Sequence, residues 1–430
     1  MHIEAALIGL VVVSLVLIIF GFPVAFALGV TAAVYLVAND FPLTLAVQEA
    51  ALSLNSFTML AIPLFMLAGM VMNAGKITDR IFDFANMAVG RIPGGLGHVN
   101  VLASLIFAGM SGSVLADVAG LGRMEIKAMR DKGYDTKFAV GVTLGSSAIG
   151  PILPPSVPMV MFGVIAEVSI TGLFLGGVLP GLLIALTLMI YVYWVGKKRE
   201  YYITERHAWP EILRAFIVAF PPLLTPFIIV GGMTLGIFSP TEAATVAVLY
   251  ALLLAVVVYR DMAWKELFDV FREVVVATSK LLFIITMALL FGWVLTVGQM
   301  PQQLAQFLGS LFADKWMFLL VINIVLLVLG AVIENAVLLL ILAPMLVPIA
   351  QSTYGIDPIH MGVVMVFNIM IGQYTPPMGL SLFIMRDITG LSLKDISLAV
   401  APFLLPLIIS LFIMTYVPEV VLWLPRTLGF

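Results

Sequence analysis

The 430-residue sequence contains no cysteine, and its four histidines are scattered without the spacing of a metal site. The chain can therefore form no disulfide, thiolate metal centre or cysteine nucleophile. No H-E-x-x-H motif and no paired histidines occur, so the sequence has no catalytic constellation and we expect no enzyme. Only 10% of the residues are charged and the net charge is -3, which gives no indication of nucleic acid binding.

Apolar sequence fills almost the whole chain, which is 62% hydrophobic and has a mean hydropathy of +1.16. A soluble core does not need this much apolar sequence. Runs such as LIGLVVVSLVLIIF and FLLVINIVLLVLGAVI are long enough to cross or enter a hydrocarbon layer about 30 Å thick. The first run has no basic n-region and no small-residue cleavage site, so we expect it to be retained. These features predict an all-α polytopic membrane protein.

Two apolar segments are interrupted by proline in the same way, at IGPILPPSVP (149–158) and IGQYTPPMGL (371–380). Proline removes a backbone donor and breaks a helix. The two breaks belong to a longer internal repeat with an offset of 222 residues, shared by Gly150 and Gly372, Pro154 and Pro376, Pro155 and Pro377, and Pro180 and Pro402. The repeat predicts two halves, 1–198 and 214–430, joined by a cytoplasmic linker at 199–213.

Each half is predicted to contain five crossings. In the first half they are about 5–20, 23–38, 53–74, the broken segment 138–166, and 172–196. In the second half they are about 215–232, 241–259, 274–298, the broken segment 359–385, and 395–417. Because the number of crossings is odd, the second half should be inverted relative to the first.

Each half also contains a predicted re-entrant helical hairpin, at 98–131 and at 317–350. The tips are the polar stretches 110–113 and 330–335. Arms of about 12 residues rise only about 18 Å, which is too short to span the bilayer. The two hairpins should therefore enter the membrane from opposite sides.

The distribution of basic residues predicts the orientation. With both termini in the periplasm, 18 of the 21 Lys and Arg residues fall on cytoplasmic segments, as the positive-inside rule requires. The loops at 39–52 and 351–358 then face the periplasm. Two amphipathic stretches, 77–91 and 263–275, are predicted to be helices in the membrane interface, or alternatively helices of cytoplasmic loops.

The broken helices and hairpin tips predict the site. Unpaired backbone groups cannot face lipid, whereas unwound carbonyls can hold an alkali cation and helix N-termini favour anions. Two breaks and two tips therefore suggest two cation sites and one shared substrate site. Asp117 and Glu334 add to this prediction, because an acid inside a membrane segment is costly and usually functional. Asp117 could alternatively line a wet vestibule or pair with a cytoplasmic arginine.

Four motifs together resemble one family over essentially the full chain. They are the tip GMSGSVLADVAGLG, the run E-x-K-A-M-x-x-x-G-Y (125–134), the break G-P-I-L-P-P-S and the break G-x-x-T-P-P-x-G. The sequence resembles the large membrane subunit of tripartite ATP-independent periplasmic (TRAP) transporters. This resemblance implies sodium-driven import of an organic acid, such as a C4-dicarboxylate or sialic acid, by an elevator-type movement in the bacterial inner membrane. It also implies a small four-helix membrane subunit, here expected as a separate chain, and a periplasmic substrate-binding protein.

The resemblance further implies roles for individual residues. The first sodium (Na+) site would comprise Ser111, Gly150, Leu153 and Pro155, and the second Gly330, Gly372, Thr375 and Met378. The candidates that contact or shape the substrate site are Ser113, Asp117, Ser156, Glu334 and Asn335. No arginine lies in either tip or break, so helix N-termini and hydroxyls are the expected carboxylate ligands. The alternatives are a stand-alone sodium/dicarboxylate-type symporter and an ion channel.

Overall fold

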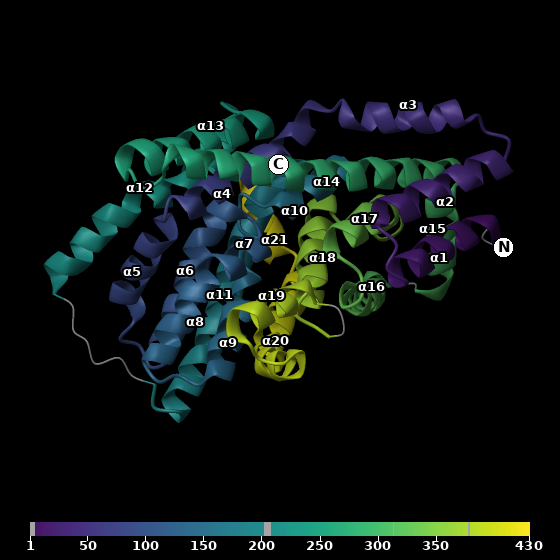
Figure 1. Cartoon of the computed structure of the whole chain (residues 1–430). Coiled ribbons are helices and arrows are strands. Elements are labelled where there is room, and N and C mark those ends of the chain that lie inside the picture. Colours follow the sequence, from purple (N-terminus) through teal and green to yellow (C-terminus); the bar gives the residue numbers. More distant parts are fainter. Residues whose placement is uncertain (1–4, 202–207, 313, 377–378) are drawn as a thin grey trace.

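The computed structural model describes residues 5–201, 208–312, 314–376 and 379–430, and within these ranges the chain forms helices and no strand (Figure 1). Seven helices of the described chain are long and apolar enough to cross a membrane. The predicted class, an all-α polytopic membrane protein, is confirmed.

The first half follows the predicted order, with one additional helix. Its helices are α1 (Ala5–Ile19), α2 (Val24–Ala38), α3 (Leu43–Leu54), the 3-10 turn η1 (Phe57–Leu60), α4 (Ala61–Ala74), α5 (Ile77–Val89), α6 (Leu96–Ser111), α7 (Val114–Ala119), α8 (Leu121–Asp131), α9 (Thr136–Ser147), α10 (Val157–Ile165) and α11 (Ile170–Lys198). The additional helix is α3, because the stretch 39–52 was predicted to be a loop.

The second half repeats this plan and ends with a short helix. Its helices are α12 (Trp209–Thr234), α13 (Pro240–Leu252), the π-helical turn η2 (Leu253–Val258), α14 (Trp264–Val297), α15 (Met300–Leu311), α16 (Lys315–Gly330), α17 (Asn335–Tyr354), α18 (Pro358–Gly372), α19 (Leu380–Thr389), α20 (Leu393–Tyr416) and α21 (Glu419–Thr427).

The 34-residue helix α14 corrects one prediction. The stretch 263–275 is not a separate interfacial helix, because it continues directly into the crossing predicted at 274–298. No glycine or proline occurs between Trp264 and Phe291, so nothing in the sequence ends the helix there. At 1.5 Å per residue α14 is about 51 Å long, and Figure 1 shows it extending along one edge of the molecule.

The surface helix α5 has its counterpart in α15. Each follows a glycine and one residue in the left-handed conformation, Lys76 (φ 52°) and Gln299 (φ 58°). These two residues are 223 positions apart, so the repeat extends to the turns that lead into the hairpins.

The two halves pack against each other in a reciprocal pattern. Helix α2 packs on α14 as α13 packs on α4, α9 packs on α20 as α18 packs on α11, and α10 packs on α17 as α7 packs on α19. At the centre, Thr187 Oγ1 and Ser410 Oγ lie 2.8 Å apart, although these residues occupy equivalent positions 223 residues apart. Equivalent residues meet in this way near a twofold axis. The inverted orientation of the second half in the membrane stays a prediction.

The second hairpin is longer than its sequence suggested. Helix α17 has 20 residues and rises about 30 Å, which is long enough to span by length and composition. The argument that short arms force re-entry therefore does not apply to α17. In the first hairpin the second arm is divided at Gly120 into α7 and α8.

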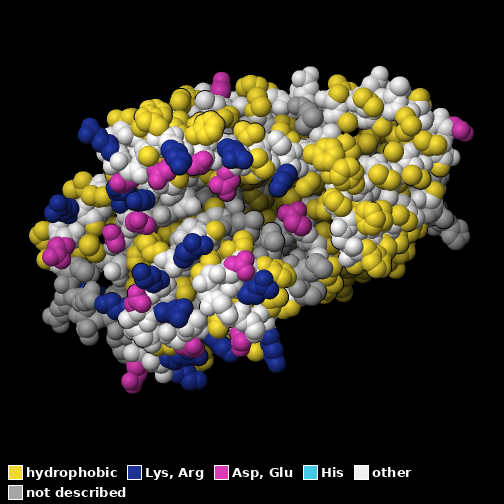
Figure 2. All heavy atoms as spheres, in the orientation of Figure 1, with side chains coloured by type: hydrophobic (Ala, Val, Ile, Leu, Met, Phe, Trp, Pro, Cys, Tyr) yellow, Lys and Arg dark blue, Asp and Glu magenta, His cyan; other side chains and the backbone are white. Residues whose placement is uncertain are grey.

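The surface is divided between apolar and charged regions. Figure 2 shows apolar side chains over the part formed by α1, α2 and α15, whereas Lys and Arg gather at the opposite end of the molecule. Large apolar side chains such as Val30, Val34 and Leu186 are more than 45% exposed. A soluble protein would bury such a surface, but a lipid bilayer covers it.

Candidate functional site

The tip of the first hairpin lies directly against the first break. Helix α6 ends at Gly112, which has a left-handed φ of 59°. A Cβ atom at Gly112 would lie 2.1 Å from the carbonyl oxygen of Pro155. Only glycine allows this approach, because the position combines a positive φ with contact to the backbone of another segment. A Cβ at Gly150 would lie 3.5 Å from the backbone of Ser113, so the tip and the break touch at two points.

Two serines begin the helices that follow the tip and the break. The hydroxyl of Ser113 accepts a hydrogen bond from the backbone N–H of Ala116 (3.4 Å) and caps α7. The hydroxyl of Ser156 accepts from the N–H of Met159 (3.2 Å) and caps α10, and it also donates to the carbonyl of Pro151. These bonds satisfy amides at the helix N-termini that have no partner within the helix.

The second tip and break make an even closer contact. Helix α16 ends at Gly330 and α18 ends at Gly372. A Cβ at Gly372 would lie 2.3 Å from the carbonyl carbon of Gly330, so the two backbones touch. The hydroxyl of Thr375 donates to the carbonyl of Ile371 (3.2 Å), and Met378 lies outside the described residues. In each half the structure thus brings together the tip and break residues predicted to bind sodium.

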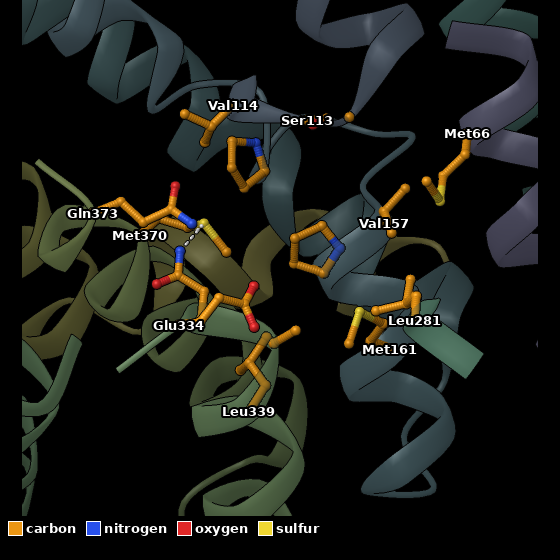
Figure 3. Close-up of a pocket in the computed structure, with 15 residues that line it drawn as sticks. Met66, Ser113, Val114, Val157, Met161, Leu281, Glu334, Leu339, Met370 and Gln373 are labelled. Carbon is orange, nitrogen blue, oxygen red and sulfur yellow. Dashed lines mark hydrogen bonds between the residues drawn. The ribbon is translucent and has the colours of Figure 1, made fainter. Parts of the chain in front are cut away.

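A cavity of about 170 Å³ lies where both tips and both breaks converge (Figure 3). Its polar lining residues are Ser113 from the first tip, Glu334 and Asn335 from the second, and Gln373 from the second break. Figure 3 shows the Glu334 carboxylate pointing toward the middle of the cavity, at the N-terminus of α17. The amide nitrogen of Asn335 donates to the sulfur of Met370 (2.9 Å), while its oxygen is buried without a partner among the described residues.

The remaining walls of the cavity are apolar and come from several helices. They include Met66 of α4, Met161 of α10, Leu281 of α14 and Leu339 of α17. A pocket with mostly apolar walls and a few convergent polar groups is the usual form of a small-molecule site. This cavity draws its lining from both halves, so their relative movement changes its shape.

Three of the five predicted substrate residues line the cavity and two do not. Ser113, Glu334 and Asn335 are lining residues. Asp117 is 3% exposed and bonded to Ser104 (2.9 Å), and Ser156 is fully buried as the cap of α10. These two residues lie behind the wall and act on the cavity only through its supporting structure.

The predicted first sodium set contains one unsatisfied buried oxygen. The Ser111 hydroxyl is buried and has no hydrogen-bond partner in the described part of the chain, and the Pro155 carbonyl faces the tip at Gly112. The Leu153 side chain points instead toward Gly181 of α11, so Leu153 can contribute only its backbone.

The sequence analysis missed a buried polar network behind the first tip. It joins Asn100, Ser104, Thr143 and Ser146 to Asp117 and Glu125. Two signals were available in the sequence. Glu125 occupies the apolar face of the amphipathic helix α8, with Leu121 and Met129, and Asn100 has a counterpart at Asn323, 223 residues later.

Comparison with known proteins identifies relatives along almost the whole chain. The family described as "Tripartite ATP-independent periplasmic transporter, DctM component" matches residues 11–420. The sialic acid TRAP transporter large permease protein SiaM of Vibrio cholerae is 44% identical over 407 residues, which cover 94% of this chain and 95% of SiaM. The C4-dicarboxylate TRAP transporter large permease protein DctM of Pseudomonas aeruginosa is 44% identical over 373 residues, 87% of each chain. These relatives are transporter components and not enzymes.

Two further similarities extend the comparison. The sialic acid TRAP transporter permease protein SiaT of Haemophilus influenzae is 39% identical over 417 residues, which cover 97% of this chain but 68% of SiaT. Among solved structures, the YdaH transporter of Alcanivorax borkumensis superposes with a TM-score of 0.67 at 14% identity, covering 98% of this chain and 99% of YdaH. This structural similarity supports the fold alone.

Proposed function

Because the chain belongs to the DctM family of tripartite ATP-independent periplasmic (TRAP) transporters, we propose that it imports a small organic acid driven by an inward sodium gradient. The observation that carries the proposal is the cavity at which two tips and two breaks converge. Alternating access through an elevator-type movement is consistent with a site lined from both halves, because opening to either side requires the halves to move relative to each other.

The substrate class follows from the relatives and from the cavity lining. Permeases similar to this chain are named for sialic acid, C4-dicarboxylates, isethionate and 2,3-diketo-L-gulonate, all of which are organic acids. No lysine or arginine lines the described cavity. We propose that the Ser113 hydroxyl, the Asn335 and Gln373 amides and the N-terminus of α10 bind the substrate anion, because hydroxyl, amide and helix N–H groups donate hydrogen bonds.

The proposed sodium sites use oxygen atoms at the two contacts between tips and breaks. Sodium is a hard cation that prefers oxygen ligands, and the chain offers hydroxyls and unwound carbonyls at both contacts. The unsatisfied Ser111 hydroxyl and the Pro155 carbonyl fit the first site. At the second, the hydroxyl proton of Thr375 is used by Ile371, which leaves oxygen lone pairs for a cation. Sodium would hold tip and break together and so favour the closed site.

We further propose two partners and a location. SiaT contains sequence beyond the part that this chain matches, since the match covers 68% of its length, which fits a permease that joins a second membrane component. This second component would be the small four-helix membrane subunit. A periplasmic substrate-binding protein would deliver the acid. The protein would lie in the bacterial inner membrane, with both termini in the periplasm.

Reconstitution tests the proposal against the stand-alone symporter. Proteoliposomes that contain this chain and its small subunit receive an inward sodium gradient, and uptake of a radiolabelled acid is measured with and without the binding protein. We expect uptake only when all three components are present. Full-rate uptake by this chain alone would contradict the tripartite mechanism and support the symporter.

A further inference from the structure

The first half buries two carboxyl groups outside the cavity. Asp117 of α7 is 3% exposed and Glu125 of α8 is 1% exposed. One oxygen of each group accepts a hydrogen bond, Asp117 Oδ2 from Ser104 (2.9 Å) and Glu125 Oε2 from the Asn100 amide (2.8 Å). The other oxygens, Asp117 Oδ1 and Glu125 Oε1, are buried and have no partner in the described part of the chain.

A continuous chain of hydrogen bonds joins the two carboxyl groups. Ser104 Oγ lies 3.0 Å from Ser146 Oγ, which donates to Asn100 Oδ1 at 2.7 Å. Asn100 in turn donates to Glu125 and also to Thr143 Oγ1 at 2.7 Å. The path from Asp117 to Glu125 therefore passes through Ser104, Ser146 and Asn100 without a gap.

The second half contains the same anchor without the acids. Asn323 and Asn368 occupy the positions of Asn100 and Ser146, with offsets of 223 and 222 residues, and Asn368 donates to Asn323 Oδ1 at 2.6 Å. At the positions that correspond to the other members, the second half is apolar under either offset: Leu327 for Ser104, Leu339 or Leu340 for Asp117, Val347 or Pro348 for Glu125, and Met365 for Thr143. One amide-centred contact thus suffices to fasten a hairpin to a broken helix, and the two acids need another explanation.

The charged groups on neighbouring helices do not compensate the two carboxyl groups. The helices packed on α7 and α8 are α4, α6, α9 and α19. Their charged or titratable side chains, with those of α8 and the adjoining Tyr374, point elsewhere: His98 bonds the Pro93 carbonyl, Arg123, Lys127, Arg130 and Asp131 are exposed, Lys137 pairs with Asp395, Arg386 and Asp387 are exposed, and Tyr374 contacts Ser147. Two ionised carboxylates in one buried network would repel each other and lack a counter-charge, which is costly. Carboxyl pairs in proteins resolve this by sharing a proton.

The directions of the hydrogen bonds place that proton. Asn100 uses both N–H groups as donors, so its oxygen accepts the proton of Ser146. The contact between the two serines then requires the proton of Ser104. Since a hydroxyl has one proton to donate, Ser104 can only accept in its contact with Asp117. A protonated Asp117 supplies the donor for that contact.

We propose that Asp117 and Glu125 form a proton-binding site, distinct from the cavity, whose proton resides on Asp117 and is shared with Glu125 through Ser104, Ser146 and Asn100. Asp117 lies one helical turn beyond Ser113, which lines the cavity. Binding or loss of the proton therefore acts on the helix that begins at the first tip. If the permease transports as proposed above, this site links uptake to pH, because a proton that favours one conformation is bound more tightly by it.

Proton binding can be measured without transport. Infrared spectra of the purified chain in lipid nanodiscs are recorded as the pH is raised, and the carbonyl band of protonated carboxylic acids is followed. We expect a band that disappears with rising pH in the wild type and is missing in Asp117→Asn. In Glu125→Gln the band should disappear about 1 pH unit or more lower, because a neighbouring negative charge no longer favours the proton. Glu273→Gln, which changes an exposed carboxyl on α14, is the matched control and should behave as wild type.

Several results would overturn the proposal. Wild-type spectra without an Asp117-dependent band would show that both groups are ionised, and loss of the band on adding sodium at constant pH would make the pair a sodium site. If Asp117→Asn does not fold, an unshifted band in Glu125→Gln contradicts the sharing of the proton.

The link to transport, which rests on the proposed function, is tested with uptake in the complete reconstituted system at constant sodium. Wild-type uptake should fall about tenfold per pH unit above the titration of the site, as a requirement for one proton predicts, and Asp117→Asn should lose this slope. An Asp117→Asn variant with the wild-type slope would contradict the link. If the wild type shows no uptake under any condition, the proposed function fails while the infrared result stands.

Discussion

Ser147 Oγ and Tyr374 Oη lie 3.1 Å apart in a buried contact between the two broken helices. Ser147 belongs to the last turn of α9, and Tyr374, which is fully buried, follows α18. Since Ser147 already donates to the carbonyl of Leu144 (2.8 Å), its oxygen accepts the proton of Tyr374. The breaks of the two halves are thus connected by a directional bond beside the proposed transport site.

This direction predicts unequal effects of two substitutions on the free energy of unfolding. Tyr374→Phe removes the donor but leaves Ser147 bonded to Leu144, so we expect a loss of about 0.5–1.5 kcal/mol. Ser147→Ala strands the buried tyrosine hydroxyl and should cost about 1–3 kcal/mol. Thermal unfolding in detergent, followed by fluorescence, measures both. A Ser147→Ala variant that is more stable than Tyr374→Phe would contradict the assigned direction.

The backbone contact between Gly330 and Gly372 predicts that the second tip tolerates no added methyl group. Gly372→Ala places a Cβ against the Gly330 backbone, and overpacking of this kind typically costs about 1–3 kcal/mol. We expect a lower unfolding temperature and reduced uptake. The control is Gly231→Ala in α12, where nothing lies within 4 Å of the added Cβ and stability should be unchanged or higher. Equal effects of the two substitutions would argue against a close contact.

Thr375 tests the second sodium site. Thr375→Val retains the shape and β-branching but removes one oxygen, and we expect sodium to bind about 5- to 150-fold more weakly, equivalent to about 1–3 kcal/mol. Because linkage is reciprocal, the sodium concentration for half-maximal uptake should rise and uptake should recover at high sodium. Thr375→Ser should stay close to wild type.

A matched control for Thr375 is Thr296→Val. Thr296 makes the same kind of bond, to the carbonyl four residues earlier (2.9 Å), but lies in α14 and does not line the cavity. Both variants lose one such bond within a helix, so a general structural effect would be shared. A sodium curve that is unshifted in Thr375→Val, or shifted equally in Thr296→Val, would remove Thr375 from the site.

The sequence predicted the contacts that depend on backbone conformation. Proline pairs and glycines at equal offsets identified both breaks, and the structure places Gly112 against Pro155 and Gly330 against Gly372. These residues act through the φ angle and the missing side chain, which are properties of the residue type itself. For this reason the location of the site could be found without coordinates.

Properties that depend on packing were harder to predict. Whether Asp117 faces the cavity or Ser104 depends on the rotation of α7, and a six-residue helix has too little periodicity to fix it. The continuity of α14 was missed because a change from charged to apolar composition was interpreted as a boundary, although no residue there ends a helix. Composition indicates the environment of a helix and not its end.

The predicted topology can be tested by labelling, because the chain has no native cysteine. Single cysteines are introduced at the exposed positions Asn39, Lys127 and Ser352 and probed with an impermeant thiol reagent in intact cells. Since the basic residues should lie in the cytoplasm, Asn39→Cys and Ser352→Cys should be labelled and Lys127→Cys should not. The reverse pattern would invert the proposed orientation. Permeabilised cells, in which all three should react, serve as the control.

The central claim is that sodium and the organic acid move together through this chain. The most direct test measures entry of radioactive sodium and of the labelled acid in the same proteoliposomes, which contain this chain, its small subunit and the binding protein. The proposed function predicts that each solute requires the other and that both enter in a fixed ratio. Acid entry at an undiminished rate without sodium on either side of the membrane would contradict it.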